Sequence, residues 1–187
     1  MRSLVLLAVI LSLATLAGLT RPAIAGNSGY RITDARGQQT NLLMTSDGKN
    51  SAVCVWQDDR TGTSQVYAQS FDSLGVKRWA ADGVLITTIG TQVSLSRVLT
   101  DSLGGAWLLY MSTIGNNMSL RAQHVDASGA STANSATPIA TGRIEDGVIG
   151  PFSAAVLPSR LLQCLCVTRG ADDRWRWAIA SLRPEIG

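Results

Sequence analysis

The sequence predicts an all-β protein made of about three four-stranded antiparallel units. Short runs rich in Val, Leu, Tyr and Trp alternate with turn sequences that contain Asp and Gly. The middle of the chain contains a diverged repeat of 54 residues, and periods of this length are typical of stacked supersecondary units. No segment after the N-terminal leader has the apolar spacing of an amphipathic helix.

The repeat is visible when residues 38–75 are set beside residues 92–129. Seven positions are identical at an offset of 54, where chance at average composition gives roughly two or three. The identical pairs are Gln38/Gln92, Asp47/Asp101, Ala52/Ala106, Ala68/Ala122, Gln69/Gln123, Asp72/Asp126 and Gly75/Gly129. The repeat divides the chain into units at about 38–88, 92–141 and 151–182, and the third unit is degenerate, with an offset of 56 to 57 residues.

Each unit resolves into short strands separated by turns. Asp47-Gly48 is a hairpin signal, and the run 51–56 is apolar on both faces, as in a strand inside a covered sheet. The expected strands are 39–45, 51–56, 65–71 and 84–88 in the first unit, 93–99, 106–111, 119–125 and 138–141 in the second, and 152–157, 161–167 and 174–182 in the third. The third unit therefore has no fourth strand of its own.

Equivalent positions on the second and third strands of the units are predicted to form the core. These residues are Ala52, Val53, Val55, Trp56, Tyr67, Ala106, Leu108, Tyr110, Leu120, Ala122, Leu165 and Val167. The cysteines, Cys54, Cys164 and Cys166, lie in apolar runs, which favours small buried hydrophobic residues over disulfides. A bridge from Cys54 to Cys164 or Cys166 is the alternative.

Residues 1–25 have the pattern of a signal peptide. A basic start is followed by an apolar run at 4–16 and by the small-x-small site Ala23-Ile24-Ala25. The apolar run is shorter than the about 20 residues of a membrane span, so we expect no stable membrane span after cleavage. The expected product is secreted, periplasmic or at the cell surface, and residues 26–187 form its repeat domain.

Removing residues 1–25 from the 187-residue chain leaves 162 residues, enough for a domain with a core of its own. It also removes Arg2 and Arg21, which leaves 14 basic and 13 acidic residues out of the original 16 and 13. Nucleic-acid binding requires a concentrated basic face. We expect no nucleic-acid partner, because the first two units contain no such cluster.

Tyr30–Thr33 precedes the first unit and aligns with the fourth strands at 84–87 and 138–141. A β-propeller closes its ring when one end of the chain completes the sheet built by the other, which removes exposed edges. Closure predicts that Tyr30–Thr33 pairs antiparallel with Arg174–Leu182. Propellers typically have four to eight blades, so three other arrangements stay open: a homo-oligomer that completes the ring, an open ring, and a fragment of a longer array.

The units resemble the repeats of large exported bacterial β-propeller-like proteins, which read roughly DGxGGAxVAWxDxRxGxxDIYAQRVDAxGxxxWxxxGV. The resemblance rests on Trp56–Gly62 and Val66–Gln69 in the first unit, and on Asp101–Ala106 and Arg121–Gly129 in the second. It implies an extracellular or cell-surface β-propeller-like domain of a kind usually without an assigned enzymatic activity. The third unit departs from the pattern, because it lacks the Asp-x-x-Gly-Gly opening.

Two acidic turns beside aromatic residues are the candidate binding sites. The first contains Asp58, Asp59 and Arg60; its carboxylates could bind a cation such as Ca²⁺, or Asp58 could open the turn while Arg60 bridges to a carboxylate. The second contains Asp172, Asp173, Trp175 and Trp177. The two tryptophans alternate onto one face, where they would either stack on a glycan or be buried between units.

No catalytic residue, metal site or cofactor is predicted. His124 is the only histidine, and no nucleophile motif, phosphate loop or dinucleotide fingerprint is present in the sequence. The sequence favours an exported, non-catalytic structural or interaction module with an unknown protein or glycan as partner. The alternative is a glycosidase-type hydrolase or glycan-binding domain that uses Asp58, Asp59 or Asp172 as carboxylates.

Overall fold

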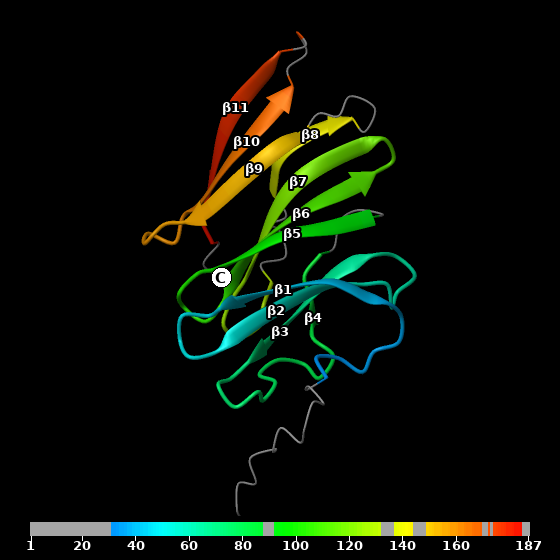
Figure 1. The fold of residues 1–187 in the computed structure, drawn as a ribbon, viewed down its shortest axis with the longest axis vertical. Coiled ribbons are helices and arrows are strands. Elements are labelled where there is room, and N and C mark those ends of the chain that lie inside the picture. Colours follow the sequence, from blue (N-terminus) through cyan, green and yellow to red (C-terminus); the bar gives the residue numbers. More distant parts are fainter. Residues whose placement is uncertain are drawn as a thin grey trace, which may run out of the picture.

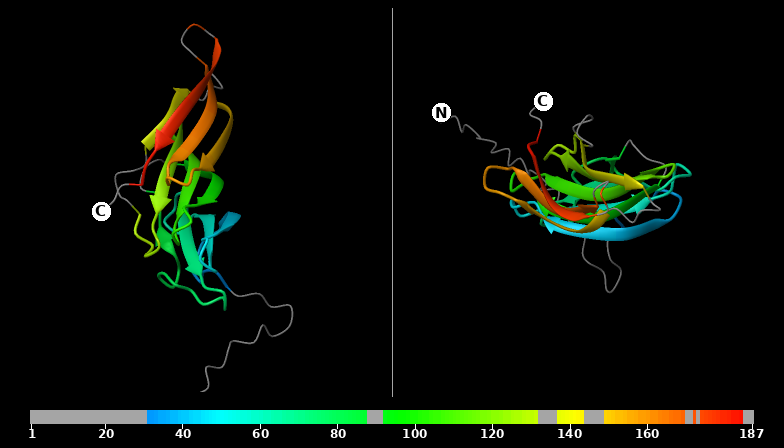
Figure 2. Two further views of the ribbon diagram at one scale, coloured as in Figure 1. Left: turned by 90° about the vertical axis from the view of Figure 1, so that its left-hand side faces the viewer. Right: turned by 90° about the horizontal axis from the view of Figure 1, so that it is seen from above.

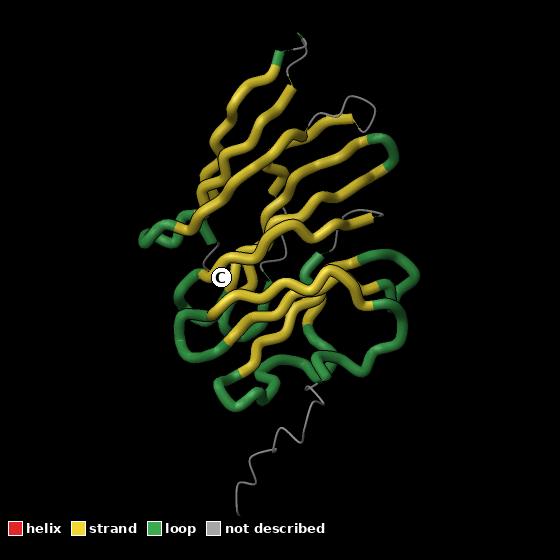
Figure 3. The backbone as a smooth tube through the Cα atoms, viewed as in Figure 1, coloured by secondary structure: helices red, strands yellow, loops and turns green. Residues whose placement is uncertain are grey.

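A computed structural model of the chain describes residues 31–87, 92–131, 137–143, 149–169, 172 and 174–184. The described residues form strands and no helix, so the all-β prediction is confirmed (Figure 3). The strands are β1 (Gln39–Ser46), β2 (Ala52–Asp58), β3 (Gln65–Phe71), β4 (Val84–Leu85), β5 (Gln92–Thr100), β6 (Ala106–Ile114), β7 (Asn117–Val125), β8 (Thr137–Arg143), β9 (Ile149–Val156), β10 (Leu162–Arg169) and β11 (Trp175–Leu182). The predicted leader lies outside the described residues.

The strands form three antiparallel sheets, which follow one another along the long axis of the molecule (Figure 1). Sheet 1 contains β1–β4, sheet 2 contains β5–β8, and sheet 3 contains β9–β11. In each sheet the hydrogen-bonded neighbours are consecutive in the chain. The turned view in Figure 2 shows the same succession, with the blue and cyan strands of sheet 1 at one end and the orange and red strands of sheet 3 at the other.

The sheets pack on one another through two apolar cores. We call the face of each sheet that points in the direction from sheet 1 to sheet 3 its forward face, and the opposite face its rear face. The forward face of sheet 3 is therefore the face that points away from sheet 2. The first core joins the forward face of sheet 1 to the rear face of sheet 2 and contains Val53, Val55, Val66, Ala68, Ile86, Val93, Leu95, Ala106, Leu108, Tyr110 and Val125. The second core joins sheet 2 to sheet 3 in the same sense and contains Trp107, Leu109, Leu120, Ala122, Ala140, Leu162, Cys164 and Cys166.

A side-chain amide strengthens the contact between sheets 1 and 2. Gln57 on β2 donates from Nε2 to the carbonyl oxygen of Val93 at 3.0 Å, and its Oε1 accepts from the amide of Leu95 at 3.0 Å. In sheet 2 the position of Gln57 is occupied by Met111, which packs against the second core. The first pair of sheets is therefore joined by backbone-directed hydrogen bonds as well as by apolar contacts.

The fourth strand of sheet 1 is shorter than predicted. β4 contains only Val84 and Leu85, and residue 88 lies outside the described part of the chain. The amide of Val66 donates to Oγ1 of Thr87 at 2.9 Å, and the amide of Ile86 donates to the carbonyl of Val66 at 2.8 Å. β4 ends here because the hydroxyl of Thr87, in place of a backbone carbonyl, accepts from the amide of Val66, and because the side chain of Ile86 packs in the first core.

Three of the predicted core positions are wrong. Leu165 is 38% exposed, and Ala52 and Val167 are half-buried, whereas the other predicted positions are buried. On β10 the buried side chains are instead those of the alternate residues Leu162, Cys164 and Cys166. The reason is that sheet 3 packs on sheet 2 through one face only, and Leu165 and Val167 lie on the other face. All three cysteines of the chain are buried and free of disulfides.

The predicted ring-closing pairing is also wrong for the residues that the structure describes. Arg31–Thr33 forms no strand, and Tyr30 lies outside the described chain. Thr33 Oγ1 instead donates to Asp82 of sheet 1's own β3–β4 connection at 3.0 Å. β11 pairs with β10 in a full ladder and lies at the edge of sheet 3.

Candidate functional site

The first acidic turn forms a connected polar cluster at the end of β2. The indole Nε1 of Trp56 donates to Oδ2 of Asp58 at 2.9 Å, and the backbone amide of Arg60 donates to Oδ1 at 2.9 Å. Nη2 of Arg60 forms an ion pair with Oδ2 of Asp58 at 2.6 Å. The guanidinium of Arg60 also lies 3.9 Å from the centroid of the Tyr67 ring, and Tyr67 stacks on Trp56 at 6.3 Å.

This arrangement fixes Asp58 as a buried anion. Burial alone raises the pKa of Asp58, but hydrogen bonds from Arg60 and Trp56 outweigh burial and lower it. The hydrogen bond to Asp58 raises the pKa of Arg60 in turn. Both carboxylate oxygens of Asp58 are occupied by these donors, so the carboxylate serves the turn and the ion pair rather than a ligand.

Asp59 is separate from Asp58 although it is the next residue. Its side chain is exposed, and Oδ1 accepts from the amide of Gln38 at 2.6 Å, which ties the turn to the segment before β1. The two neighbouring carboxylates therefore do not converge. Within the described ranges, no group of three or more His, Cys, Asp or Glu side chains is placed to hold a metal ion.

The second acidic turn lies on sheet 3, at the opposite end of the molecule from the first (Figure 1). Asp172 is exposed and forms a bidentate ion pair with Arg176, and the hydrogen bond from Arg176 lowers the pKa of Asp172. Asp173 lies outside the described residues. The structure does not bring Asp172 together with Asp58 or Asp59, so these carboxylates cannot act as a glycosidase pair within one chain.

The two tryptophans of sheet 3 are exposed rather than buried. Trp175 is 54% exposed and Trp177 is 70% exposed, and both lie on the forward face of β11. Ile179 on the same face is 72% exposed. The guanidinium of Arg169 lies 5.9 Å from the Trp175 ring centroid. This forward face is an apolar, aromatic surface, and Arg169 lies beside it.

Four of the predicted Asp- and Gly-containing turns share one hydrogen-bond arrangement, which was not predicted. Oδ1 of each aspartate accepts from the backbone amides two and four residues later. These turns are Asp47 with Lys49 and Ser51, Asp72 with Leu74 and Val76, Asp101 with Leu103 and Gly105, and Asp126 with Ser128 and Ala130. In three of these turns the signal in the sequence is the spacing Asp-x-x-Gly, since Gly75, Gly104 and Gly129 have positive φ, whereas in the Asp47 turn Asn50 has the positive φ.

His124 forms a buried pair with one of these turns. Its Nε2 lies 2.9 Å from Oδ2 of Asp101, and its ring lies 5.0 Å from the ring of Trp107. Burial raises the pKa of Asp101, but the bond to His124 and the two backbone amides outweigh it and lower it. The contact gives His124 a structural role, because its partner already caps a turn.

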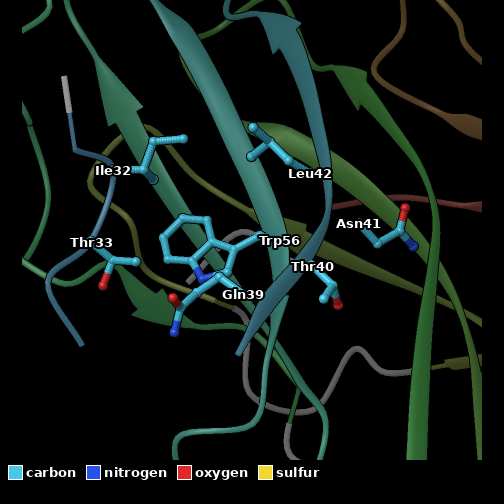
Figure 4. A pocket seen from close by; sticks show the side chains of 7 residues that line it. All are labelled: Ile32, Thr33, Gln39, Thr40, Asn41, Leu42 and Trp56. Atoms are coloured by element: carbon cyan, nitrogen blue, oxygen red, sulfur yellow. The ribbon is translucent and has the colours of Figure 1, made fainter. Parts of the chain in front are cut away.

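Two hollows adjoin sheet 1. A cavity of about 220 Å³ on its rear face is lined by Ile32, Thr33, Gln39, Thr40, Asn41, Leu42 and Trp56, as Figure 4 shows. A wider groove of about 680 Å³ runs between the β2–β3 turn and sheet 2 and contains one carboxylate, that of Asp59, among polar and methionine side chains. The cavity is mainly apolar, and the groove lacks a second acid for general acid–base chemistry.

The described part of the chain contains no helix that is long and apolar enough to cross a membrane. In comparisons with known proteins, no family model matches the chain, and no curated protein is significantly similar to it.

Proposed function

We propose that the protein is an exported, non-catalytic β-propeller-like module that acts by binding a partner through an exposed sheet face. The observation that carries this proposal is the forward face of sheet 3, where Trp175, Trp177 and Ile179 are each more than half exposed. Exposed apolar clusters of this kind mark interaction surfaces, because leaving them in water is costly.

The propeller-like arrangement is supported by the way the sheets succeed one another. Each sheet is an antiparallel meander in chain order. The first strands of the sheets are neighbours, since β1 contacts β5 and β5 contacts β9. The forward face of one sheet packs on the rear face of the next. An arc of three blades would have these properties.

A non-catalytic role is supported by the use of the acidic side chains. Asp58 is held by Trp56 and Arg60, and Asp101 is held by His124. Asp172 lies at the other end of the molecule and pairs with Arg176. A typical glycoside hydrolase needs two carboxylates that flank the scissile bond, whereas these carboxylates are dispersed and have structural partners.

Glycan binding through the same face is the second candidate. Trp175 and Trp177 lie on one side of β11, and exposed tryptophan faces suit the apolar faces of sugars. This candidate uses the same surface and differs from a protein partner only in the ligand.

Export is tested by expressing the full chain and determining the N-terminus of the product. We expect release outside the cytoplasm with Gly26 as the first residue, and an intact leader in the cytoplasm would contradict export.

The absence of catalysis is tested with a broad panel of glycosides. Turnover that is lost in the Asp58→Asn variant would contradict the non-catalytic role. A glycan array with wild type and Trp177→Ala decides whether the face binds sugars.

A further inference from the structure

We infer that the protein associates head to tail with a second copy of itself. The forward face of sheet 3 in one copy packs on the rear face of sheet 1 in the other. This inference rests on the proposed function and deepens it, because it names the partner of the exposed face. The chemistry is the same apolar sheet-to-sheet packing that already occurs twice within the chain.

The forward face of sheet 3 carries apolar residues at the positions through which sheets 1 and 2 pack on the next sheet. On β2 and β3 the ladder pair Val55–Ala68 is buried in the first core, and on β6 and β7 the equivalent pair Leu109–Ala122 is buried in the second. An offset of 56 residues leads from Leu109 to Leu165, whose ladder partner is Ile179. Leu165 is exposed by 38% and Ile179 by 72%. Sheet 3 thus presents large apolar side chains where sheets 1 and 2 bury theirs.

The rear face of sheet 1 is the matching surface. Its Met44 is 68% exposed, whereas Val98, which occupies the same position on β5, packs against the first core. Ile32 lines the open cavity beside Trp56 (Figure 4), whereas Ile86, 54 residues later, is buried in the first core. The open part of the rear face of sheet 1 is therefore the area around Met44 and the cavity, because Cys54 and Trp56, which correspond to Leu108 and Tyr110 of the first core, are already buried.

Each copy offers one face of each kind, so two copies can pair at both ends. Among the described residues, the faces that no further sheet covers belong to the first and last sheets of the succession, at opposite ends of the molecule. Two copies that each use both faces have six sheets, since each chain provides three. This number lies within the four to eight blades typical of closed propellers. Closure by two copies also fits the preference of homo-oligomers for closed symmetric assemblies.

The test uses one charged substitution on each face, made in the chain from residue 26 onward. Ile179→Asp alters the forward face of sheet 3, and Met44→Lys alters the rear face of sheet 1. Both side chains are mostly exposed, so circular dichroism should show unchanged folding. Leu74→Asp is the matched control, because Leu74 is also exposed but lies in the Asp72 turn, away from both faces. Molar mass is measured by light scattering and sedimentation over a wide concentration range.

We expect wild type and Leu74→Asp to approach twice the chain mass as concentration rises. The dissociation constant of the dimer should be about tenfold higher or more in each face variant than in wild type, because a buried charge opposes packing. An equimolar mixture of Ile179→Asp and Met44→Lys should recover dimers. In the mixed dimer one interface is unaltered and the other joins charges of opposite sign.

A wild-type protein that stays monomeric at every concentration would overturn the inference, as would dimers unaffected by both face variants. Failure of the mixture to associate would also contradict head-to-tail pairing. A monomer that binds glycans through Trp177 would overturn the inference and leave the proposed binding role intact. Glycoside turnover by a wild-type dimer would overturn the non-catalytic role and leave the pairing intact.

Discussion

Gly83 lies directly against the indole ring of Trp56. A Cβ atom added to Gly83 would fall 2.5 Å from Cη2 of Trp56 and 2.8 Å from the carbonyl oxygen of Ala68. The backbone of Gly83 also has a φ of +83°, a conformation that residues with a side chain rarely adopt. The β3–β4 connection therefore covers Trp56 only because this position has no side chain.

We predict that Gly83→Ala destabilises the protein by about 2 to 4 kcal/mol, since backbone strain and overpacking both contribute. Gly62→Ala is the control, because Gly62 has a φ of +86° but no atom within 4 Å of the added Cβ. Gly62→Ala should lower the free energy of unfolding only through backbone strain, by about 1 to 2 kcal/mol. Urea unfolding of the two variants measures the difference. Equal losses would show that the indole contact adds nothing.

Trp56→Ala should lower the free energy of unfolding by about 3 to 5 kcal/mol. The side chain is only 2% exposed, stacks on Tyr67 and donates to Asp58. Trp56→Phe retains part of the apolar contact but loses the hydrogen bond and part of the buried ring volume, so its loss should be smaller, about 1 to 3 kcal/mol. Thermal and urea unfolding give both values, and an unchanged melting temperature in Trp56→Ala would contradict the packing described for sheet 1.

Replacing Asp58 should change how stability depends on pH. The pKa of Asp58 is lowered in the folded protein, because the bonds from Arg60 and Trp56 outweigh burial. Its contribution is therefore fully present above the unfolded pKa of about 4 and is lost as the pH falls through the lower folded pKa. We expect Asp58→Asn to lose about 1 to 3 kcal/mol near neutral pH, and its deficit relative to wild type should shrink toward about pH 2.

Asp59→Asn is the control for this experiment, because Asp59 is exposed and its bond to the amide of Gln38 needs only an acceptor oxygen. Its effect should stay within about 0.5 kcal/mol. Urea unfolding at a series of pH values gives both curves. A deficit of Asp58→Asn that is the same at every pH would show that the carboxylate charge does not stabilise the fold.

The cysteines should be unreactive in the folded protein. Burial raises the pKa of the Cys164 thiol to about 11, with a smaller effect from Cys166, and burial also raises the pKa values of Cys54 and Cys166. Because the thiolate is the reactive form, native protein near pH 8 should react slowly with a thiol reagent. Unfolded protein should react rapidly at all three cysteines of the chain. Fast labelling of the native state would contradict their burial.

The strands of the first two units could be predicted closely because turns and apolar runs alternate clearly there. The expected strand 65–71 has the bounds of β3. The orientation of β10 could not be predicted, since the run 161–167 is apolar on both faces and has no period of two to identify the buried one. The end of β4 depends on a hydroxyl of Thr87 that replaces a backbone acceptor. Neither feature leaves a pattern in the sequence.

In the candidate site, only contacts between residues that are close in the sequence could be predicted. The ion pair between Asp58 and Arg60 follows from their spacing in one turn, and the structure shows it. The separation of Asp58 from Asp172 depends on how whole sheets are placed, which spacing along the chain does not reveal. The pairing of His124 with Asp101 is also non-local, because the two residues are 23 positions apart and meet only when β7 lies beside the β5–β6 turn within sheet 2.

The bonds of Gln57 have a mechanical consequence for the molecule. Within sheet 1 the amide is held by Asn41 and Ser64, and its partners on β5 are the peptide groups of Val93 and Leu95. It therefore resists sliding between sheets 1 and 2 whatever side chains β5 carries. Met111 at the matching position offers a thioether in apolar contact, which has no preferred direction. The joint between sheets 1 and 2 is therefore fixed in register at this point by directional bonds, whereas Met111 leaves the register at its own position to shape complementarity alone.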